Sequence, residues 1–411
     1  MKTTILSTWV LFTCCMSLSL THAADWPSWR GPLGSGVSLD SSTYPSKWSE
    51  KDIEWKTRLP GYGISGPVVY GNRVFVTANG ERQKDRLFVS SLERNTGKIV
   101  WTREYWGGGT TSSHPWTGTS APTPIVDSKH VYALFSTGEV VCHDHEGNLI
   151  WLRSIVRDYG QYQIRHGMAS SPALYKNLLL VCIDQEEENG PSYLLALDKN
   201  TGKTVYNKPH NSTVTSWASP ILATVNGKQQ LITGGDKLQG YDPETGEKIW
   251  EAAPGGSYSS PVVGKGLAIL VGKGHRSVAV KLGGKGDVTD THTAWTAVKG
   301  QPRMPSAICA GDYYLTIKDD GILTCFDMTT GKDVWQKRLG GGFTSSPIMA
   351  DGKVYFISQT GETTIVRPGK TAKILAKTPA LGDRVIACPA ASDGQIFIRG
   401  DKFLFCIGKA K

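Results

Sequence analysis

The chain has 411 residues with 47 glycines and 13 tryptophans, and 45 Lys and Arg residues exceed 36 Asp and Glu residues. This composition suits a protein rich in turns and β structure, and the length excludes a single ordinary hydrophobic core, so we expect several domains or one repeat array. The basic residues are interspersed with acidic ones and form no run, which indicates a solvated surface and argues against a nucleic-acid partner.

Residues 1–23 have the pattern of a secretory signal peptide. Lys2 precedes an apolar stretch from Ile5 to Leu20, and Thr21-His22-Ala23 has small residues where a signal peptidase requires them. Serines and threonines interrupt the stretch, which argues against a retained membrane anchor. We therefore expect cleavage after Ala23 and a periplasmic or secreted protein without a transmembrane segment.

Two of the eight cysteines, Cys14 and Cys15, belong to this leader, and the other six lie in apolar runs. We expect these six to be small buried hydrophobic residues. No CxxC motif occurs, which argues against a cysteine zinc site or attached c-type haem. Disulfide pairing among the last four stays open, and these four are Cys309, Cys325, Cys388 and Cys406.

An internal repeat follows the leader. Eight units of about 40 to 55 residues each open with a proline before an apolar strand, and each continues with a short turn and a second strand. The opening prolines are Pro67, Pro122, Pro172, Pro220, Pro261, Pro305, Pro347 and Pro389.

A second repeated element is a turn followed by an aromatic residue. Its clearest copies run from Asp242 to Trp250 and from Asp327 to Trp335, and weaker copies end at Trp101, Trp151, Tyr206 and Trp295. The Asp side chain can accept hydrogen bonds from backbone amides two or three residues ahead, and Gly supplies the positive φ of a tight hairpin. We expect each aromatic ring to pack between neighbouring units.

Four antiparallel strands in each unit predict an all-β fold, an eight-bladed β-propeller of four-stranded blades. The eighth unit, residues 386–407, has only three strands, whereas a strand with the missing aromatic stands early in the chain at Ile53-Glu54-Trp55-Lys56. We expect this N-terminal strand to close the last blade. The domain interpretation is a signal peptide at 1–23, an N-terminal extension at 24–51 and the propeller at 52–411.

The repeated turn resembles the pyrroloquinoline-quinone-like (PQQ-like) propeller repeat, with its pattern Asp-x-x-Thr-Gly-Lys-x-x-Trp, from Trp55 to Ile407. The segment from Asp25 to Pro32 is similar to the start of secreted members of that group. A family member of similar architecture is the lipoprotein B subunit of the outer-membrane barrel assembly machinery, a non-enzymatic scaffold. The resemblance therefore implies a scaffold.

The same resemblance implies a second interpretation, a small quinoprotein dehydrogenase. Such enzymes carry an adjacent cysteine pair against the quinone, and here the adjacent pair lies in the leader. Their calcium-binding Glu, Asn and Asp set does not map onto this sequence. We therefore expect no cofactor, no bound metal and no catalytic residues.

Long connections all fall on one face of the predicted disc. They occupy residues 77–86, 102–119, 152–170, 184–192, 207–216 and 377–385, whereas the first-to-second and third-to-fourth strand turns are predicted to be short. Long loops are where binding residues tend to lie. We call this side the long-loop face and predict that it binds a partner.

The candidate binding residues on this face are aromatic and basic, types that suit a protein or polysaccharide partner. They are Tyr105, Trp106, His114, Trp116, Arg157, Tyr159, Tyr162, Arg165, His166, Trp217, His275, Arg276, Arg303 and Arg384. The opposing interpretation is that the large rings pack the loops against one another.

Other motifs carry less weight. Gly61-Tyr62-Gly63-Ile64-Ser65-Gly66 precedes a strand, not the helix of a nucleotide fold. His143-Asp144-His145 is predicted to form a solvated turn, and Glu186-Glu187-Glu188 a solvated loop. The Ser-Ser-Pro starts at Ser171, Ser260 and Ser346 should line the central channel and hold backbone or water, not act as nucleophiles.

The sequence therefore predicts a secreted, non-enzymatic propeller scaffold that binds its partner through the long-loop face in envelope or outer-membrane assembly, with peripheral association with the cell envelope. A carbohydrate-binding propeller and a small quinoprotein dehydrogenase are the alternatives. An aromatic platform on the long-loop face would favour the first alternative, and metal ligands in the channel would favour the second. Asn211-Ser212-Thr213 is an N-glycosylation sequon whose use the sequence does not decide.

Overall fold

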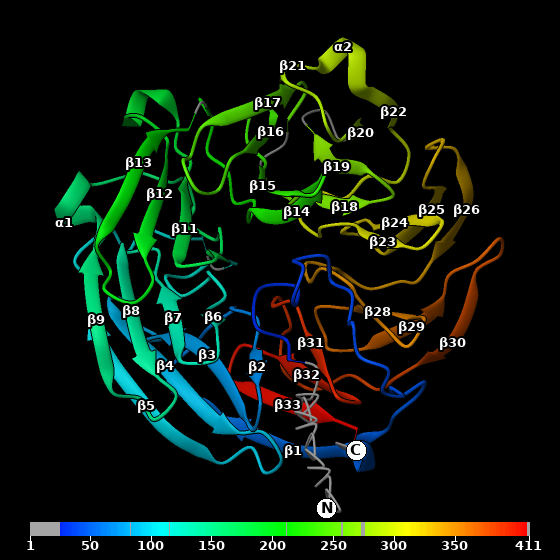
Figure 1. Ribbon diagram of the computed structural model, residues 1–411. Coiled ribbons are helices and arrows are strands. Elements are labelled where there is room, and N and C mark those ends of the chain that lie inside the picture. Colours follow the sequence, from blue (N-terminus) through cyan, green and yellow to red (C-terminus); the bar gives the residue numbers. More distant parts are fainter. Residues whose placement is uncertain are drawn as a thin grey trace, which may run out of the picture.

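The computed structural model describes residues 25–82, 84–114, 116–210, 212–255, 258–272 and 276–408. The predicted leader and Asn211 of the sequon lie outside these residues. Eight sheets stand in a ring around a central channel, and the four strands of each blade pair antiparallel (Figure 1). The predicted eight-bladed β-propeller is confirmed.

The strands of each of the first four blades follow one another in the chain and pair in sequence order. Blade 1 is β2 (Val68–Tyr70), β3 (Arg73–Asn79), β4 (Arg86–Glu93) and β5 (Ile99–Trp106), and blade 2 is β6 (Ile125–Val126), β7 (His130–Leu134), β8 (Glu139–Asp144) and β9 (Leu149–Ser154). Blade 3 is β10 (Ala173–Tyr175), β11 (Leu178–Ile183), β12 (Tyr193–Asp198) and β13 (Thr204–Pro209), and blade 4 is β14 (Ile221–Val225), β15 (Lys228–Thr233), β16 (Leu238–Tyr241) and β17 (Lys248–Ala252).

The remaining blades follow the same plan, except that the eighth has three strands from this part of the chain. Blade 5 is β18 (Val262–Gly264), β19 (Leu267–Gly272), β20 (Arg276–Lys281) and β22 (Thr293–Ala297), and blade 6 is β23 (Ile308–Ala310), β24 (Tyr313–Ile317), β25 (Ile322–Asp327) and β26 (Asp333–Arg338). Blade 7 is β27 (Ile348–Ala350), β28 (Lys353–Ile357), β29 (Thr363–Arg367) and β30 (Lys373–Lys377), and blade 8 has β31 (Ala390–Ser392), β32 (Gln395–Arg399) and β33 (Phe403–Ile407).

Short helices occur in the connections, and the middle strands form the core. The helices are η1 (Glu50–Asp52), α1 (Ile155–Tyr159), η2 (Glu187–Asn189) and α2 (Thr289–His292). Six of the seven residues of β3 are buried, whereas β26 at the rim of the disc is almost wholly exposed. This gradient arises because neighbouring blades cover both faces of the inner strands.

The N-terminal strand β1 (Ile53–Arg58) closes the ring, as predicted. It pairs antiparallel with β33, with Trp55 opposite Cys406 and Arg58 opposite Phe403. The last blade is therefore built from both ends of the propeller, and the C-terminal strand has no free edge on that side.

Aromatic rings of the outermost strands join each blade to the next. In six cases the ring donates a hydrogen bond of 2.8–3.0 Å to a backbone carbonyl in the third-to-fourth strand turn of the following blade. The donor and acceptor residues are Trp55 and Arg94, Trp101 and His145, Trp151 and Lys199, Tyr206 and Pro243, Trp295 and Met328, and Trp335 and Gly369. The predicted role of the aromatic residues between units is confirmed.

Blade 4 departs from this pattern. Trp250 is buried but donates to Gln230 of its own blade. The cause is an insertion between the third and fourth strands of blade 5, which contains α2 and β21 (Gly286–Asp287), a strand that pairs parallel with β17. The prediction that all such turns are short is therefore wrong for blade 5.

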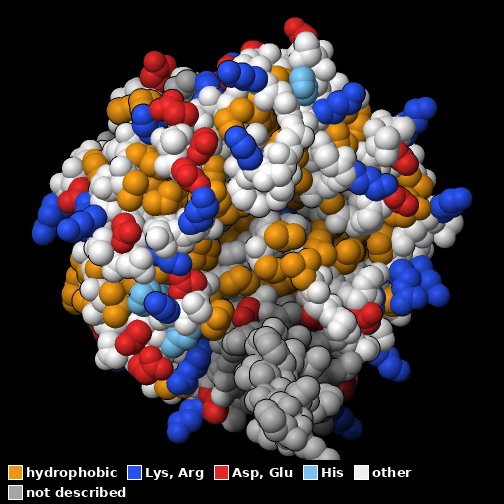
Figure 2. Space-filling view, viewed as in Figure 1, with side chains coloured by type: hydrophobic (Ala, Val, Ile, Leu, Met, Phe, Trp, Pro, Cys, Tyr) orange, Lys and Arg blue, Asp and Glu red, His pale blue; other side chains and the backbone are white. Residues whose placement is uncertain are grey.

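A segment before β1, residues 25–48, crosses the disc, and we call it the N-terminal strap. It contacts first strands near their turns, through bridges from Trp26 to Val69 and from Val37 to Met349. In Figure 1 the strap passes over the centre of the ring, and Figure 2 shows hydrophobic side chains gathered there. The strap thus covers the face opposite the long loops.

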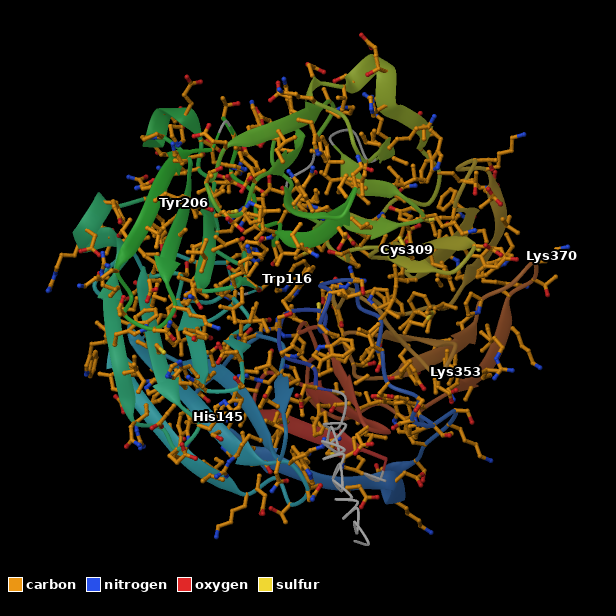
Figure 3. The ribbon with its side chains drawn as sticks, viewed as in Figure 1. Trp116, His145, Tyr206, Cys309, Lys353 and Lys370 are labelled. Carbon is orange, nitrogen blue, oxygen red and sulfur yellow. The ribbon has the colours of Figure 1, made fainter. Side chains whose placement is uncertain are left out.

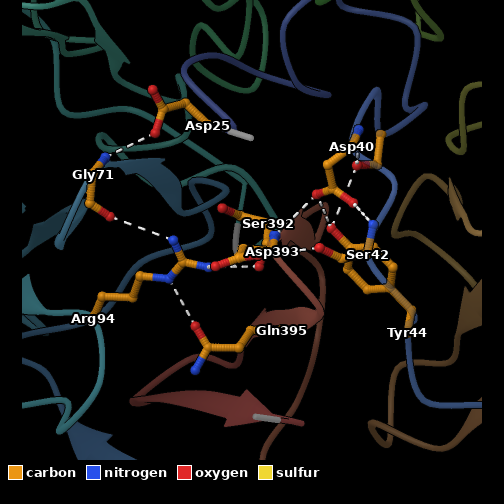
Figure 4. Close-up of polar contacts among 10 residues, drawn as sticks. Asp25, Asp40, Ser42, Tyr44, Gly71, Arg94, Ser392, Asp393 and Gln395 are labelled. Atoms are coloured by element: carbon orange, nitrogen blue, oxygen red, sulfur yellow. Dashed lines mark hydrogen bonds and ion pairs between the residues drawn. The ribbon is translucent and has the colours of Figure 1, made fainter. Parts of the chain in front are cut away.

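Polar contacts fix the strap at Asp25 and at Asp40 (Figure 4). Asp25 accepts a hydrogen bond of 2.8 Å from the Gly71 amide, and Asp40 accepts one of 2.9 Å from the Asp393 amide. Arg94 extends the network by donating to Gln395 and to the Ser392 carbonyl, both at 2.7 Å. The strap is therefore held to blades 1 and 8, where the ring closes.

All six cysteines after the leader are free thiols in the structure; four are buried, and Cys309 and Cys388 are half-buried. Within the described ranges, no helix has the length and apolar character needed to cross a membrane.

Candidate functional site

A cavity of about 420 Å³ occupies the central channel and opens toward the long-loop face. Its floor is Trp29 of the strap, its wall is formed by the residues that enter the first strands, and its rim comes from the connections between blades. A volume of this size suits a small ligand or an inserted side chain of a partner.

The wall is a ring of side-chain hydroxyls joined to backbone amides. Each hydroxyl accepts a hydrogen bond of 2.8–3.0 Å from the equivalent amide of the preceding blade. The donating amides belong to Gly66, Thr123, Ser171, Ser219, Ser260 and Ser306. The accepting hydroxyls belong, in the same order, to Thr123, Ser171, Ser219, Ser260, Ser306 and Ser346. The predicted role of the serines, holding backbone around the channel, is confirmed.

The hydroxyl ring shows that the first strand of blades 2 and 6 begins two residues later than the sequence pattern predicted. Thr123, not the residue before Pro122, holds the ring position in blade 2, and Ser306 holds it in blade 6. The residues that open the first strands are therefore Pro124 and Ala307, two positions after the prolines that marked the repeat in the sequence.

The rim carries a continuous series of aromatic rings from consecutive blade connections. The ring centroids are 5.3 Å apart for His114 and His166, 6.0 Å for His166 and Trp217, and 4.8 Å for Trp217 and Tyr258. The last two pairs are stacked, with interplanar angles of 23° and 15°. Trp116 lies edge-on to His114 at 5.5 Å, near the centre of the disc (Figure 3).

Basic groups accompany these rings. The guanidinium carbon of Arg303 lies 5.3 Å from the centroid of Tyr258, a cation–π geometry. Desolvation, together with the nearby Arg165, His114 and Arg303, lowers the pKa of His166 and favours its neutral form. No Asp or Glu is among the described residues that line the cavity.

The structure brings together five of the fourteen candidate residues, namely His114, Trp116, His166, Trp217 and Arg303. Others lie away from the channel. Trp106 is exposed at the end of β5, Arg157 is exposed on α1, and Arg384 pairs with Asp401 at 2.9 Å. Arg165 lines a separate surface cavity, Arg276 is exposed at the start of β20, and His275 lies outside the described residues.

Three candidate tyrosines have structural contacts. Tyr162 is buried and donates a 3.0 Å hydrogen bond to the Ser136 carbonyl, so its expected role as a surface contact is wrong. Tyr105 bonds to His143, and Tyr159 to Thr204. The packing interpretation therefore holds for Tyr162, because a phenol ring in a long loop can fold back into the core when its hydroxyl finds a partner.

The motif His143-Asp144-His145 does not form the solvated turn that we expected. His143 is buried against Trp101, and burial lowers its pKa to about 4. His145 donates a 2.9 Å hydrogen bond from Nε2 to the Asp127 carbonyl and packs against Phe75. These rings fill the boundary between blades 1 and 2, which the turn prediction missed because it ignored the neighbouring blade.

One constellation was not predicted. His210 bonds to Asp184 through Nδ1 and to the Thr233 hydroxyl through Nε2 at 3.0 Å. The sequence of hydroxyl, imidazole and carboxylate resembles the nucleophile, base and acid of a catalytic triad. All three residues are buried and His210 packs against Tyr241, so the set joins blades 3 and 4 and has no substrate access.

Sequence reasoning also missed Trp29, Tyr258 and Met304 in the lining. Tyr258 stands two residues before the ring position Ser260, just as Trp217 stands two residues before Ser219. This shared offset would have identified Tyr258. The strap residue Trp29 has no repeat to mark it.

The sequence profile described as outer membrane protein assembly factor BamB matches residues 45–219 and 190–402. The chain belongs to this family. Among curated proteins no sequence match was found.

Solved structures share the fold. BamB from Moraxella catarrhalis has a TM-score of 0.61 at 12% identity, covering 87% of this chain and 99% of its own. A europium-containing methanol dehydrogenase has a TM-score of 0.71 at 12% identity, covering 94% and 98% of the two chains. The quinohemoprotein alcohol dehydrogenase from Comamonas testosteroni has a TM-score of 0.69 at 13% identity, covering 94% and 81%.

The dehydrogenase likeness raises the question of a metal and quinone in the channel. Hard cations prefer carboxylate oxygens, and the described lining offers none. The part of the chain that the structure describes also holds no group of three or more His, Cys, Asp and Glu placed to bind a metal ion. The donor set does not fit such a centre, and we derive no redox step through it.

Proposed function

We propose that this BamB-family propeller is a non-enzymatic scaffold of the cell envelope that binds a protein partner with its channel rim. The observation that carries the proposal is the series of aromatic rings at the mouth of the channel. Trp116 is 38% exposed and Tyr258 is 40% exposed, and Arg303 stands beside Tyr258. Tryptophan, tyrosine and arginine are the residues that most often dominate protein interfaces.

The rim is also held in place before any partner arrives. Trp217 donates a 2.9 Å hydrogen bond to the Gly167 carbonyl, and the His114 amide donates one of 3.1 Å to the His166 carbonyl. Preorganised side chains lose less conformational entropy on binding, which favours affinity. The family description, an assembly factor of the outer membrane, supports a role in bringing proteins together.

Binding at the rim predicts that a photo-cross-linking amino acid in place of Trp116 captures the partner in envelope preparations, whereas the same group at Lys332 on the opposite face does not. With the captured partner purified, Trp116→Ala and Tyr258→Ala should each raise Kd about fivefold or more, about 1 kcal/mol. Biolayer interferometry measures both. Trp106→Ala is the matched control, because Trp106 is 60% exposed but lies on the outer part of blade 1.

Equal affinity of all three variants would place the partner elsewhere on the disc and leave the rim rings as loop packing.

A carbohydrate-binding role is the second candidate, because exposed Trp116 and Tyr258 rings at the edge of a cavity also suit the apolar face of a sugar. Titration of the purified protein with soluble envelope glycans separates the two. Saturable glycan binding that is lost in Tyr258→Ala would favour this candidate over a protein partner.

Export is part of the proposal, and it rests on the pattern of residues 1–23. We predict that the exported protein begins at residue 24, since Thr21 and Ala23 fit the small-residue positions of a signal peptidase site. Intact-mass measurement of the protein from the envelope fraction checks this, and a mass that includes Met1 would contradict it.

A further inference from the structure

The hydroxyl ring in the channel wall has a chemical property that the scaffold role does not use. Each of its six hydroxyls, from Thr123 to Ser346, is buried in the wall of the cavity and accepts one backbone amide hydrogen. A hydroxyl that accepts one bond still carries its own proton. Among the described residues no acceptor is bonded to any of these six protons, so the ring can donate into the channel.

A buried positive charge lies next to this ring, behind the residues that line the cavity. Arg30 of the strap is 1% exposed and donates to the carbonyls of Ala307 at 2.7 Å and Pro347 at 3.4 Å, residues that follow Ser306 and Ser346 of the ring. Its Nε and Nη1 atoms have no hydrogen-bond partner, and within the described ranges it forms no ion pair. Burial lowers its pKa to about 10, so it is still charged at pH 7.

Such an arrangement is costly without a counter-charge. A buried cation lacking an acidic partner destabilises the fold, and buried polar atoms without partners often mark the place of an absent ion or water. Thr344 shows the same deficiency, because it lines the cavity, is 8% exposed, and its hydroxyl has no partner. Arg303 stands at the rim, and the described lining holds no carboxylate to balance these positive charges.

We propose that the channel binds a small ligand through an oxyanion group, a carboxylate or a phosphate. The ring hydroxyls donate to its oxygens, Arg303 at the rim and the buried Arg30 behind the wall supply compensating charge, and the stacked rings of Trp217 and Tyr258 contact the rest of the ligand. A cation would meet like charge and find no anionic ligand. The site goes beyond the proposed scaffold role, since it needs no protein partner.

The test uses purified protein at low ionic strength and three probes of similar size: benzoate, its neutral isostere benzamide, and phenyl phosphate. Tryptophan fluorescence and calorimetry measure Kd. We expect benzoate or phenyl phosphate to bind about tenfold or more tightly than benzamide, and the two anions distinguish a carboxylate from a phosphate site. Arg303→Gln should weaken anion binding about fivefold and leave benzamide unchanged.

A pair of matched variants separates ligand donation from structural effects. Thr344→Val removes an unpartnered hydroxyl in the cavity wall, and Thr363→Val removes an unpartnered buried hydroxyl in β29 away from the cavity. We expect only Thr344→Val to weaken anion binding, with Tm unchanged or raised in both.

Benzamide binding as tight as benzoate, an absence of binding by both anions, or full anion affinity in Arg303→Gln would overturn the oxyanion site. The protein partner is assayed separately, through Trp116→Ala. The anion site can therefore fail while the scaffold proposal stands, and the scaffold proposal can fail while the anion site stands.

Discussion

A chain that begins at residue 59, and therefore lacks β1, should lose most of its folding free energy. The strand forms a five-residue ladder with β33 and contributes Trp55, which is buried against Phe397 and donates a 2.8 Å bond to the Arg94 carbonyl. Loss of a buried tryptophan alone costs about 3–5 kcal/mol, against a typical total of about 5–15 kcal/mol. Urea unfolding followed by circular dichroism measures the effect.

The control for this truncation is a chain that begins at residue 49. It lacks the same strap but keeps η1 and β1, so the difference between the two chains isolates ring closure. We expect the longer chain to unfold cooperatively, at a lower urea midpoint than the full protein because Tyr44 and Trp48 are lost from the core. The shorter chain should also aggregate through the exposed edge of β33. Equal midpoints for the two truncated chains would show that β1 does not hold the ring together.

The fold could be predicted because the same local sequence pattern recurs in several units of the repeat. Asp327 accepts hydrogen bonds from the amides of Thr329 at 3.1 Å and Thr330 at 2.8 Å, as the turn pattern predicts, and Asp242 does the same with Glu244 and Thr245. These contacts are local in sequence. Because the eighth unit has three strands where the others have four, the early strand around Trp55 is the natural candidate to complete the last blade.

The strap could not be predicted, because its contacts are distant in sequence and follow no period. Arg30 bonds to Ala307, 277 residues away, and the bridge from Val37 to Met349 spans a similar separation. Nothing in Asp25 to Pro32 distinguishes a segment that crosses the channel from a free extension. The floor of the cavity, Trp29, was missed for this reason.

The candidate site was only partly predictable, since residue type does not decide which way a loop side chain turns. Trp116 and Tyr162 both lie in long connections, yet Trp116 reaches the rim while Tyr162 is 2% exposed beneath Ser136. The choice depends on a hydrogen-bond acceptor in another connection, between β7 and β8, which the sequence does not place. The repeated ring position, by contrast, offers a usable signal, because the residue two positions before each of the six accepting residues lines the cavity.

The second large effect concerns a glycine of the repeated turn, Gly331. It has a φ of +68°, and a Cβ atom there would lie 2.5 Å from the indole of Trp295, the ring that docks from the preceding blade. Gly331→Ala must therefore both strain the backbone and displace a tryptophan that is 7% exposed. Backbone strain of this kind costs about 1–2 kcal/mol, and displacement of the ring approaches the cost of deleting it, about 3–5 kcal/mol.

Gly311 provides a matched control in the same blade. Its φ is +64°, but a Cβ atom there would meet nothing within 4 Å, so Gly311→Ala carries the backbone strain without the clash. We expect Gly331→Ala to lower the free energy of unfolding by about 2 kcal/mol or more beyond Gly311→Ala, measured in urea. In a Trp295→Ala background this excess should disappear, because the cavity left by the indole accommodates the methyl group. If Gly331→Ala and Gly311→Ala were equally destabilising, the turn glycine would serve only its own backbone conformation, and the docking of one blade on the next would not depend on it.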